Sequence, residues 1–369
     1  MMATRGIIYL AGPRGDKIRR ALESTGLEVS YIELDAARSW FQRLGVLHNT
    51  IVNIWKQRYH TVAFMMDFIG NYSLVLWLVC RLLKVPFVIR LRGDMWRELG
   101  EAVDLAQSLR EKIAYRWQLA LVSVVISHAD MTVPVSTYLK QRILEELPAI
   151  PPERVAPAPM FINLDRFQAR PHDSSIREKL GLPVDALVVC TVTDFSYHDK
   201  ARGLNSALDV LDPLMHVNAR IHWLITGGGM YHAAFKGAIL GRAQSRAQIH
   251  FLGESSNVAL IYLASDLLVY FSFMDTFPNV VLEAQACGIP AVVNAFGGMP
   301  GQVIQGETGY VVDLSSLDQV RQLTKRLLFD VDRRRRMGAA ARQFIESNFH
   351  YSVVGQQFAT AFRALPVRN

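Results

Sequence analysis

Short apolar runs rich in β-branched residues alternate with amphipathic stretches along most of the chain, and this alternation restricts the fold more than any other feature. Such a pattern is typical of parallel sheets that helices cover on both faces. In the first half we expect strands at Gly6–Ala11, Glu28–Leu34, Thr61–Met66, Phe87–Leu91 and Met131–Val135. We expect helices at Asp16–Ser24, Tyr72–Leu83, Glu111–Ser127 and Thr137–Glu146.

A proline-rich segment, Leu147–Pro159, interrupts the alternation, because proline disfavours helices and suits a connector. Further strands are expected at Leu187–Thr193, Ile221–Thr226, Ile249–Leu252, Leu267–Phe271 and Ala291–Asn294. Further helices are expected at Leu204–Leu211, Val258–Ala264, Pro278–Ala286, Ser316–Phe329, Arg334–Ser347 and Val353–Ala364. We therefore expect an α/β protein of two Rossmann-like, doubly wound domains that face each other across a ligand cleft. The expected domains are 1–165, which the helix at 353–369 rejoins, and 166–352.

The composition excludes several classes of protein. Half of the 369 residues are hydrophobic and a fifth are charged, which excludes a mainly disordered or fibrous chain. Cys80, Cys190 and Cys287 are widely spaced, which argues against a disulfide scaffold or a zinc cluster and fits a reducing, cytosolic compartment. The longest apolar run in the most hydrophobic window, Leu74–Cys80, is far shorter than the ~20 residues that span a bilayer. We expect neither a signal peptide nor a transmembrane helix.

Positive charge is concentrated in the first half of the chain. The net charge is +7, and residues 1–170 hold 22 Lys and Arg against 16 Asp and Glu. An uneven positive field favours an anionic partner, such as a membrane surface, nucleic acid or a phosphorylated substrate. A generally basic proteome is the alternative explanation.

The segment Ser272–Gly288 carries the strongest functional signal. A strand is expected to end near Phe271, and a helix to begin at Pro278, so that Asp275 lies at the carboxyl end of the strand and Glu283 on the helix. Amides at the helix start favour an anion, and carboxylates accept hydrogen bonds from sugar hydroxyls. The alternative is that Asp275 caps the helix and that Glu283 is a solvated helix residue.

This segment resembles the E-x7-E region of the GT-B glycosyltransferases, specifically the retaining GT4 family, also called glycosyltransferase group 1. The resemblance rests on Ser272, Asp275, Phe277, Pro278, Glu283, Ala284, Gly288-Ile289-Pro290, Gly297-Gly298, Gly306 and Thr308–Val312. Upstream, Phe251-Leu252-Gly253 and Ala264-Ser265-Asp266 also match, and weaker similarities extend over most of the chain.

The resemblance implies a GT-B hexosyltransferase whose second domain binds a nucleotide-sugar donor and whose first domain binds the acceptor. It implies that Asp275, at a position where the family has Glu, is a catalytic residue that contacts the sugar, and that Glu283 contacts the ribose. The other donor-binding positions that it implies are Gly227, Gly228, Gly253, Ser272, Phe277, Pro278, Asn279 and Val280.

The family stabilises the departing diphosphate with basic residues after the first strand of the second domain. Lys200 and Arg202 match this position and are expected to be catalytic; the alternative is that both are solvated cations. With these cations and the helix amides, the resemblance implies no metal cofactor. Gly227-Gly228-Gly229 follows a predicted strand and either approaches the ligand or forms a plain turn.

In the first domain, Gly12, Arg14 and Gly15 occupy the first strand-to-helix turn, where relatives approach the donor phosphate or the acceptor. Arg92 stands where many relatives have a His. As a fixed cation, it binds a phosphate or an acidic acceptor, or it pairs with Asp94. The sequence alone does not distinguish between these two roles of Arg92.

A second acidic motif, Asp330-Val331-Asp332, is interpreted as an interhelical loop with a helix cap and not as a metal site, because four arginines follow it at 333–336. This arginine run is expected to be a solvated helix face. The scattered histidines contain no HExxH, and no metal site is expected.

Three classes of function remain. The first is retaining transfer of a sugar from a nucleoside-diphosphate sugar to a hydroxyl of a glycan or lipid-linked acceptor. The second is a GT-B-type epimerase that acts on the nucleotide sugar alone. The third is a non-catalytic basic module that binds membranes or nucleic acid, although no nucleic-acid-binding motif is present.

A peripheral membrane location is a further expectation. The apolar segment Tyr72–Leu83 and the tryptophans Trp40, Trp55 and Trp77, together with the basic first domain, suggest contact with an anionic membrane from the cytoplasmic side. The alternative is that these residues are core and ordinary surface.

Overall fold

The computed structural model describes residues 6–11, 18–33, 40–169 and 174–366, and the side chains of 40–42, 174 and 200 are outside this description. The chain separates into two compact units. Unit 1 comprises residues 1–161 and 351–369, and unit 2 comprises residues 162–350. The first boundary lies just after the proline-rich segment 147–159.

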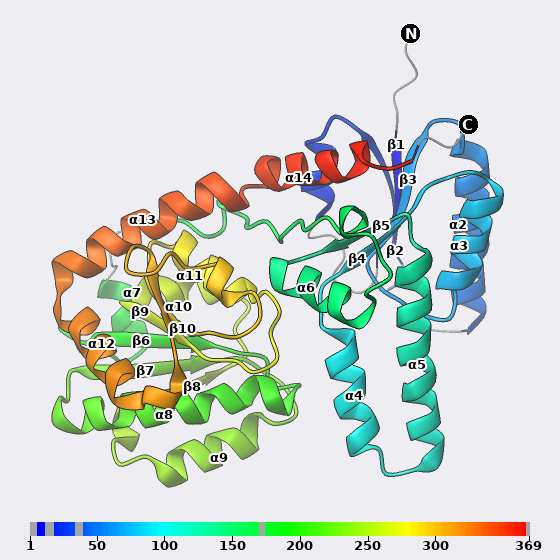
Figure 1. Cartoon of the computed structure of the whole chain (residues 1–369). Helices are drawn as coiled ribbons and strands as arrows, with labels where there is room; N and C mark the ends of the chain where they lie inside the picture. Colours follow the sequence, from blue (N-terminus) through cyan, green and yellow to red (C-terminus); the bar gives the residue numbers. More distant parts are fainter. Residues whose placement is uncertain (1–5, 12–17, 34–39, 170–173, 367–369) are drawn as a thin grey trace. The chain divides into compact units, whose positions relative to one another are not determined.

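Unit 1 contains a parallel sheet in the order β2-β1-β3-β4-β5 (Figure 1). Its strands are β1 Gly6–Ala11, β2 Glu28–Glu33, β3 Thr61–Met66, β4 Phe87–Leu91 and β5 Met131–Pro134. Its α-helices are α1 Arg19–Glu23, α2 Trp40–Gln57, α3 Ser73–Leu82, α4 Met95–Leu105, α5 Leu109–His128, α6 Thr137–Glu146 and α14 Tyr351–Arg363. The last helix packs on α1, since a Cβ at Gly355 would lie 2.4 Å from the carbonyl oxygen of Ala21.

Unit 2 contains a parallel sheet in the order β11-β10-β9-β6-β7-β8. Its strands are β6 Leu187–Val192, β7 Ile221–Thr226, β8 Ile249–Gly253, β9 Leu267–Tyr270, β10 Ala291–Asn294 and β11 Gly309–Val312. Its α-helices are α7 Ser174–Lys179, α8 His198–Val217, α9 His232–Arg242, α10 Val258–Ala264, α11 Asn279–Ala286, α12 Leu317–Phe329 and α13 Val331–Phe349.

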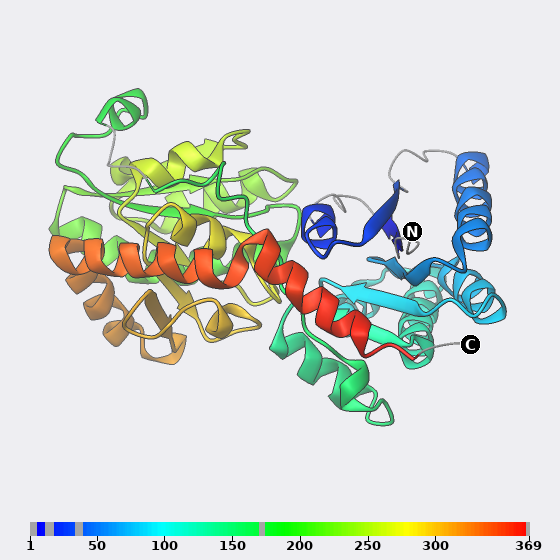
Figure 2. The same cartoon turned by 90° about the horizontal axis from the view of Figure 1, so that it is seen from above.

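Helices cover both faces of the unit 2 sheet. Helices α8, α9 and α12 lie over one face, and α10 and α11 lie over the other (Figure 1). Helix α13 contributes Met337 to the first core cluster and Ile345 and Phe349 to the second. Seen from above, α13 crosses the second of these faces (Figure 2). β6 and β7 are buried along their whole length. This burial explains their continuous apolar sequences, because a central parallel strand has no solvent-facing side.

The expected α/β fold with parallel sheets is confirmed, and the differences lie in individual elements. The sequence did not predict α2, α4, α7, α9 or β11. The helix expected at Leu204–Leu211 extends from His198 to Val217 and contains Pro213. Packing of α8 on the sheet and on α12 outweighs the hydrogen bond that proline cannot donate. In the described part of the chain, no helix has both the length and the apolar character needed to cross a bilayer.

Candidate functional site

The strand order of unit 2 creates a topological switch point at β6. β6, the first strand of this sheet, pairs with β7 on one side and β9 on the other. The helices that follow β6 and β9 leave toward opposite faces, since α8 belongs to one core cluster and α11 to the other. Ligands of open α/β sheets bind at such switch points, beyond the carboxyl ends of the strands.

Asp275 lies in the loop after β9, and its carboxylate is fixed by neighbouring hydroxyls. Ser272 Oγ donates a hydrogen bond to Asp275 Oδ2 at 2.9 Å, and the buried Tyr270 hydroxyl donates to the same oxygen. Burial, reinforced by the Asp275 charge, raises the pKa of Tyr270 well above its usual value, so the phenol stays a donor. The interpretation of Asp275 as a helix cap is wrong, because α11 has Pro278 at its N-cap position.

Glu283 lies on α11 and is half-buried. Its carboxylate accepts a 3.0 Å hydrogen bond from the hydroxyl of Tyr262. Tyr262 is fully buried, and burial, together with the charge of Glu283, raises the pKa of this tyrosine well above its usual value. Glu283 is therefore oriented by the core, and its interpretation as a solvated residue is wrong.

The amino end of α11 offers backbone donors. No side chain caps this end of the helix. The first amides of a helix have no intrahelical partner, and the helix dipole favours an anion there. Two buried polar atoms at the same edge, Thr193 Oγ1 and Asn279 Oδ1, have no hydrogen-bond partner within the described chain. Each of these two oxygens can therefore still accept a hydrogen bond.

Arg202, on the second turn of α8, lies beside the loop that carries Asp275. Its guanidinium lies 4.6 Å from the ring centroid of Phe273 and 3.5 Å from Asp199, and 45% of the side chain is exposed. The neighbouring Gly203 makes this approach possible, since a Cβ there would lie 1.7 Å from the carbonyl oxygen of Phe271. Lys200 lies in the first turn of the same helix, and its side chain is outside the described part of the structure.

The glycines after β7 serve loop packing. Gly227 has a φ of +147°, and a Cβ there would lie 1.8 Å from the carbonyl oxygen of Thr193. Gly228 accepts a hydrogen bond from the amide of Phe195, and Gly227 donates to the carbonyl of Gly253. These contacts join the loops after β6, β7 and β8 at the carboxyl edge of the sheet. Gly227 and Gly228 thus allow close contact with the backbone of the neighbouring loops.

The remaining donor-binding candidates lie around this edge. Ser272 is buried and holds Asp275, while Pro278, Asn279 and Val280 form the start of α11. The ring of Phe277 packs at 5.8 Å from the ring of Phe349, within the core of unit 2. Sequence reasoning missed Tyr262, Tyr270, Phe273 and Gly203, because nothing in the sequence shows that a buried phenol meets a carboxylate.

In unit 1, Arg92 does not pair with Asp94. Arg92 Nη2 lies 3.7 Å from Oδ2 of Asp67, a buried carboxylate to which the hydroxyl of Tyr9 donates at 2.9 Å. Asp94 instead accepts from the amide of Arg97 and caps α4. The pairing alternative for Arg92 is therefore wrong. Gly12, Arg14 and Gly15 lie outside the described residues.

The acidic motif at 330–332 forms a helix cap, as interpreted from the sequence. Asp330 Oδ1 accepts from the amide of Arg333 at the start of α13. Within the described chain, no group of three or more His, Cys, Asp or Glu could hold a metal ion.

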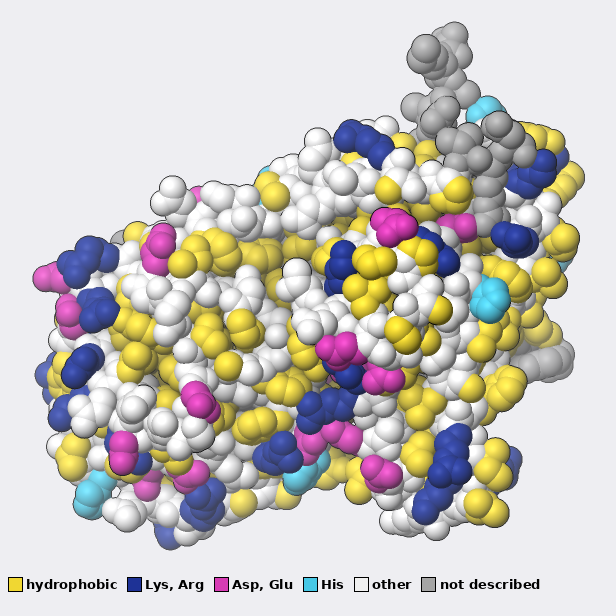
Figure 3. Space-filling model, viewed as in Figure 1, with side chains coloured by type: hydrophobic (Ala, Val, Ile, Leu, Met, Phe, Trp, Pro, Cys, Tyr) yellow, Lys and Arg dark blue, Asp and Glu magenta, His cyan; other side chains and the backbone are white. Residues whose placement is uncertain are grey.

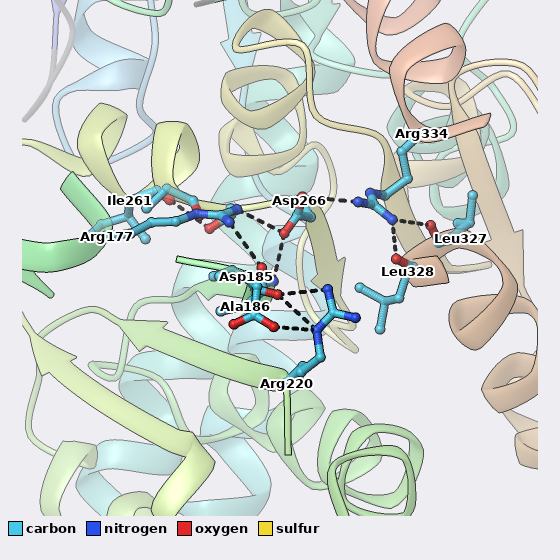
Figure 4. A network of polar contacts seen from close by, with 12 residues as sticks. Arg177, Asp185, Ala186, Arg220, Ile261, Asp266, Leu327, Leu328 and Arg334 are labelled. Carbon is cyan, nitrogen blue, oxygen red and sulfur yellow. Dashed lines mark hydrogen bonds and ion pairs between the residues drawn. The ribbon is translucent and has the colours of Figure 1, made fainter. Parts of the chain in front are cut away.

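The arginine run differs from the expectation, because Arg334 is buried. It donates to the carbonyl oxygens of Leu327 and Leu328 and lies 3.3 Å from the carboxylate of Asp266 (Figure 4). The sequence interpretation of a fully solvated face is wrong at this position.

Comparison with known proteins shows what parts of this chain are similar to. Residues 173–344 match the family model of the glycosyl transferases group 1. This similarity covers most of unit 2 and a little under half of the whole chain. N-acetyl-alpha-D-glucosaminyl L-malate synthase of Bacillus anthracis is 33% identical over 115 residues, which cover 31% of this chain and 30% of the relative.

A second relative is the GDP-mannose-dependent monoacylated alpha-(1-6)-phosphatidylinositol monomannoside mannosyltransferase of Corynebacterium glutamicum. It is 27% identical over 220 residues, 56% of each chain. The matches thus span 30% of the length of the first curated relative and 56% of the length of the second.

Solved structures agree on the fold. Anabaena HepE, solved in complex with UDP, superimposes with a TM-score of 0.74 at 14% identity and covers 98% of this chain and 100% of its own. WaaG, a glycosyltransferase involved in lipopolysaccharide biosynthesis, gives a TM-score of 0.67 at 14% identity, with 96% and 98% of the two chains covered. The protein therefore has the GT-B fold.

Proposed function

We propose that the protein is a retaining glycosyltransferase that moves a sugar from a nucleoside-diphosphate sugar to an acceptor hydroxyl. The observation that carries this proposal is the grouping of Asp275, Arg202 and the uncapped amino end of α11 at the switch point of unit 2. In this proposal unit 2 binds the donor and unit 1 binds the acceptor.

Each group has a separate task. The amides of α11, with Arg202 and Lys200, stabilise the diphosphate as the bond between the sugar anomeric carbon and the phosphate oxygen breaks. Asp275 accepts hydrogen bonds from the sugar, and Glu283 accepts them from the ribose. The acceptor oxygen bonds to the anomeric carbon on the face that the phosphate leaves, and the acceptor proton passes to the departing phosphate oxygen. No metal takes part in this scheme.

The relatives suggest the substrate classes. The Corynebacterium relative is named for GDP-mannose and for a phosphatidylinositol mannoside, and HepE is solved with UDP. On the basis of these names, we propose a nucleoside-diphosphate hexose as the donor and a glycan or lipid-linked molecule as the acceptor. The enzyme would reach this acceptor from the cytoplasmic side of a membrane. Arg92, held by Asp67, is then available to an anionic acceptor group.

Nucleotide release from a panel of UDP-, GDP- and ADP-sugars tests the proposal. Glu283→Gln, Asp275→Asn and Arg202→Gln should each lower kcat/KM by about 10²-fold or more, since they remove contacts to the donor or to developing charge. Asp318→Asn and Arg242→Gln are matched controls on exposed surface pairs of the same unit and should retain activity. Near-normal rates in all three site variants contradict the assignment.

The same assay separates the alternative activity. An epimerase would convert the nucleotide sugar without any acceptor, whereas a transferase releases nucleotide in proportion to acceptor supplied. Stereoisomer analysis of the donor after incubation without acceptor therefore distinguishes the two, and a change of sugar configuration contradicts our proposal.

A further inference from the structure

Helix α5 carries large apolar side chains that remain exposed along one side. Leu109 is 75% exposed, Ile113 60%, Trp117 61% and Val124 42%. Residues four positions apart lie on one face of a helix, and Val124 follows Trp117 by two turns on this face. We call Leu109, Ile113, Trp117 and Val124 the α5 stripe. Contiguous exposed apolar surface of this kind marks an interaction site.

The α5 stripe belongs to the part of α5 that is paired with α4. In unit 1 the two helices run side by side and project together beyond the sheet (Figure 1). Further along α5, Leu121, Val122, Val125 and Ile126 are buried against the unit. α5 is 20 residues long, so the stripe follows most of a rod of about 30 Å.

Cations flank the α5 stripe. With 100° of rotation per residue, Lys112 and Arg116 lie along one side of the stripe and Arg110 along the other, and all three are exposed. Glu111 is the only acidic residue of α5, and its carboxylate accepts from the amides of Gln107 and Ser108 at the helix start. Figure 3 shows Lys and Arg side chains gathered beside hydrophobic ones at the projecting end of this helix pair.

We propose that the α5 stripe is a docking surface for an anionic lipid membrane. An apolar centre enters the boundary between headgroups and acyl chains, and flanking cations meet the anionic headgroups. A second copy of the chain fits this surface less well, because the two stripes would bring like-charged flanks together. Glu111, the one acidic residue of α5, is already bonded to the amides of Gln107 and Ser108.

This surface differs from the residues that the sequence suggested. Trp77 packs edge-on against His128, at 5.0 Å between ring centroids, and the side chain of Trp40 is outside the described structure. Trp55 is 54% exposed on α2, and α3 exposes Leu82, which is 73% exposed. Trp55 and Leu82 therefore provide a matched control for the stripe.

Co-sedimentation of the full chain with vesicles tests the proposal. We expect binding to vesicles of phosphatidylglycerol and phosphatidylcholine at low salt, and weak binding to phosphatidylcholine alone. Lys112→Gln/Arg116→Gln should weaken the vesicle partition coefficient by more than tenfold, at about fivefold per cation. Ile113→Ser/Trp117→Ser should weaken it at least as much, and Trp55→Ser/Leu82→Ser should leave it unchanged.

Three results would overturn the proposal. The first is equal binding by the wild-type chain and both stripe variants, and the second is an equal loss in the Trp55→Ser/Leu82→Ser control. The third is a dimer in light scattering that Ile113→Ser/Trp117→Ser converts to monomer, since a second copy then covers the stripe. Circular dichroism and the melting midpoint verify that the variants fold.

The proposal is independent of catalysis. Nucleotide release from a soluble donor should be unchanged in the stripe variants, because none of the substituted residues belongs to the site in unit 2. Loss of vesicle binding with intact nucleotide release, or the reverse, therefore separates a failure of the docking surface from a failure of the proposed activity.

Discussion

At the scale of single residues, one buried carboxylate, that of Asp266, connects several elements of unit 2. Asp266 follows α10 and is 8% exposed. Arg177 Nη2 donates to it at 3.0 Å from α7, Arg334 Nη2 lies 3.3 Å away on α13, and the amide of Val188 donates at 2.8 Å (Figure 4). One side chain thereby joins two helices to the sheet.

We predict that Asp266→Asn destabilises the chain by about 3 kcal/mol or more, because it leaves two buried guanidinium groups without a counter-charge. Urea unfolding measures this loss. The control is Asp185→Asn, which removes an exposed carboxylate 2.9 Å from Arg220 and should cost below about 1 kcal/mol. Equal losses in the two variants contradict the structural argument.

At the scale of elements, the site depends on how closely α8 approaches the loop after β9. Gly203 permits the contact that brings Arg202 over Phe273. The neighbouring atom is a backbone carbonyl oxygen, which cannot move aside as a flexible side chain can. The position of Arg202 is therefore a property of the packing of two elements and not of its own sequence neighbourhood.

We predict that Gly203→Ala displaces the first turns of α8, lowers the melting midpoint and reduces nucleotide release. The control is Gly237→Ala on α9, where nothing lies within 4 Å of the added Cβ. Alanine favours a helix over glycine by up to about 1 kcal/mol, so this control should be neutral or stabilising. Loss of release without loss of stability in Gly203→Ala would point to the position of Arg202 alone.

At the scale of the whole molecule, the net charge and the proposed donor site do not coincide. Residues 1–170 carry an excess of six positive charges, whereas the remainder carries 18 basic against 17 acidic residues. In the proposed function, donor binding therefore depends on a few groups placed in an almost neutral unit. The surplus charge belongs to the part of the chain that holds the α5 stripe.

We predict that a matching nucleoside diphosphate stabilises the chain in the absence of acceptor. At 100 times its Kd, a ligand that binds only the folded state adds about 2.7 kcal/mol. For a domain of this size the melting midpoint then rises by roughly 5–10 °C. Differential scanning fluorimetry measures the rise, which Glu283→Gln should reduce and inorganic phosphate should not reproduce. An equal rise in Glu283→Gln argues against the proposed ribose contact.

Most strands were predictable, because a fully buried parallel strand has a continuous apolar sequence that can be recognised locally. β3, β4, β7 and β10 have the limits that the sequence predicted. The sequence did not predict the helices α2, α4, α7 and α9, because tertiary packing supplies much of a helix's stability and the sequence signal is then weak.

The sequence by itself determined the alternating architecture, the place of Asp275 after a strand and the place of Glu283 on the helix that follows. These follow from periodicity and from motif spacing, both of which are properties of neighbouring residues. Only the tertiary structure decided that Tyr262 and Tyr270 orient the two carboxylates, that Arg92 pairs with Asp67, and that Arg334 is buried. These contacts join residues far apart in the chain or fix which way a side chain faces, and local sequence contains neither.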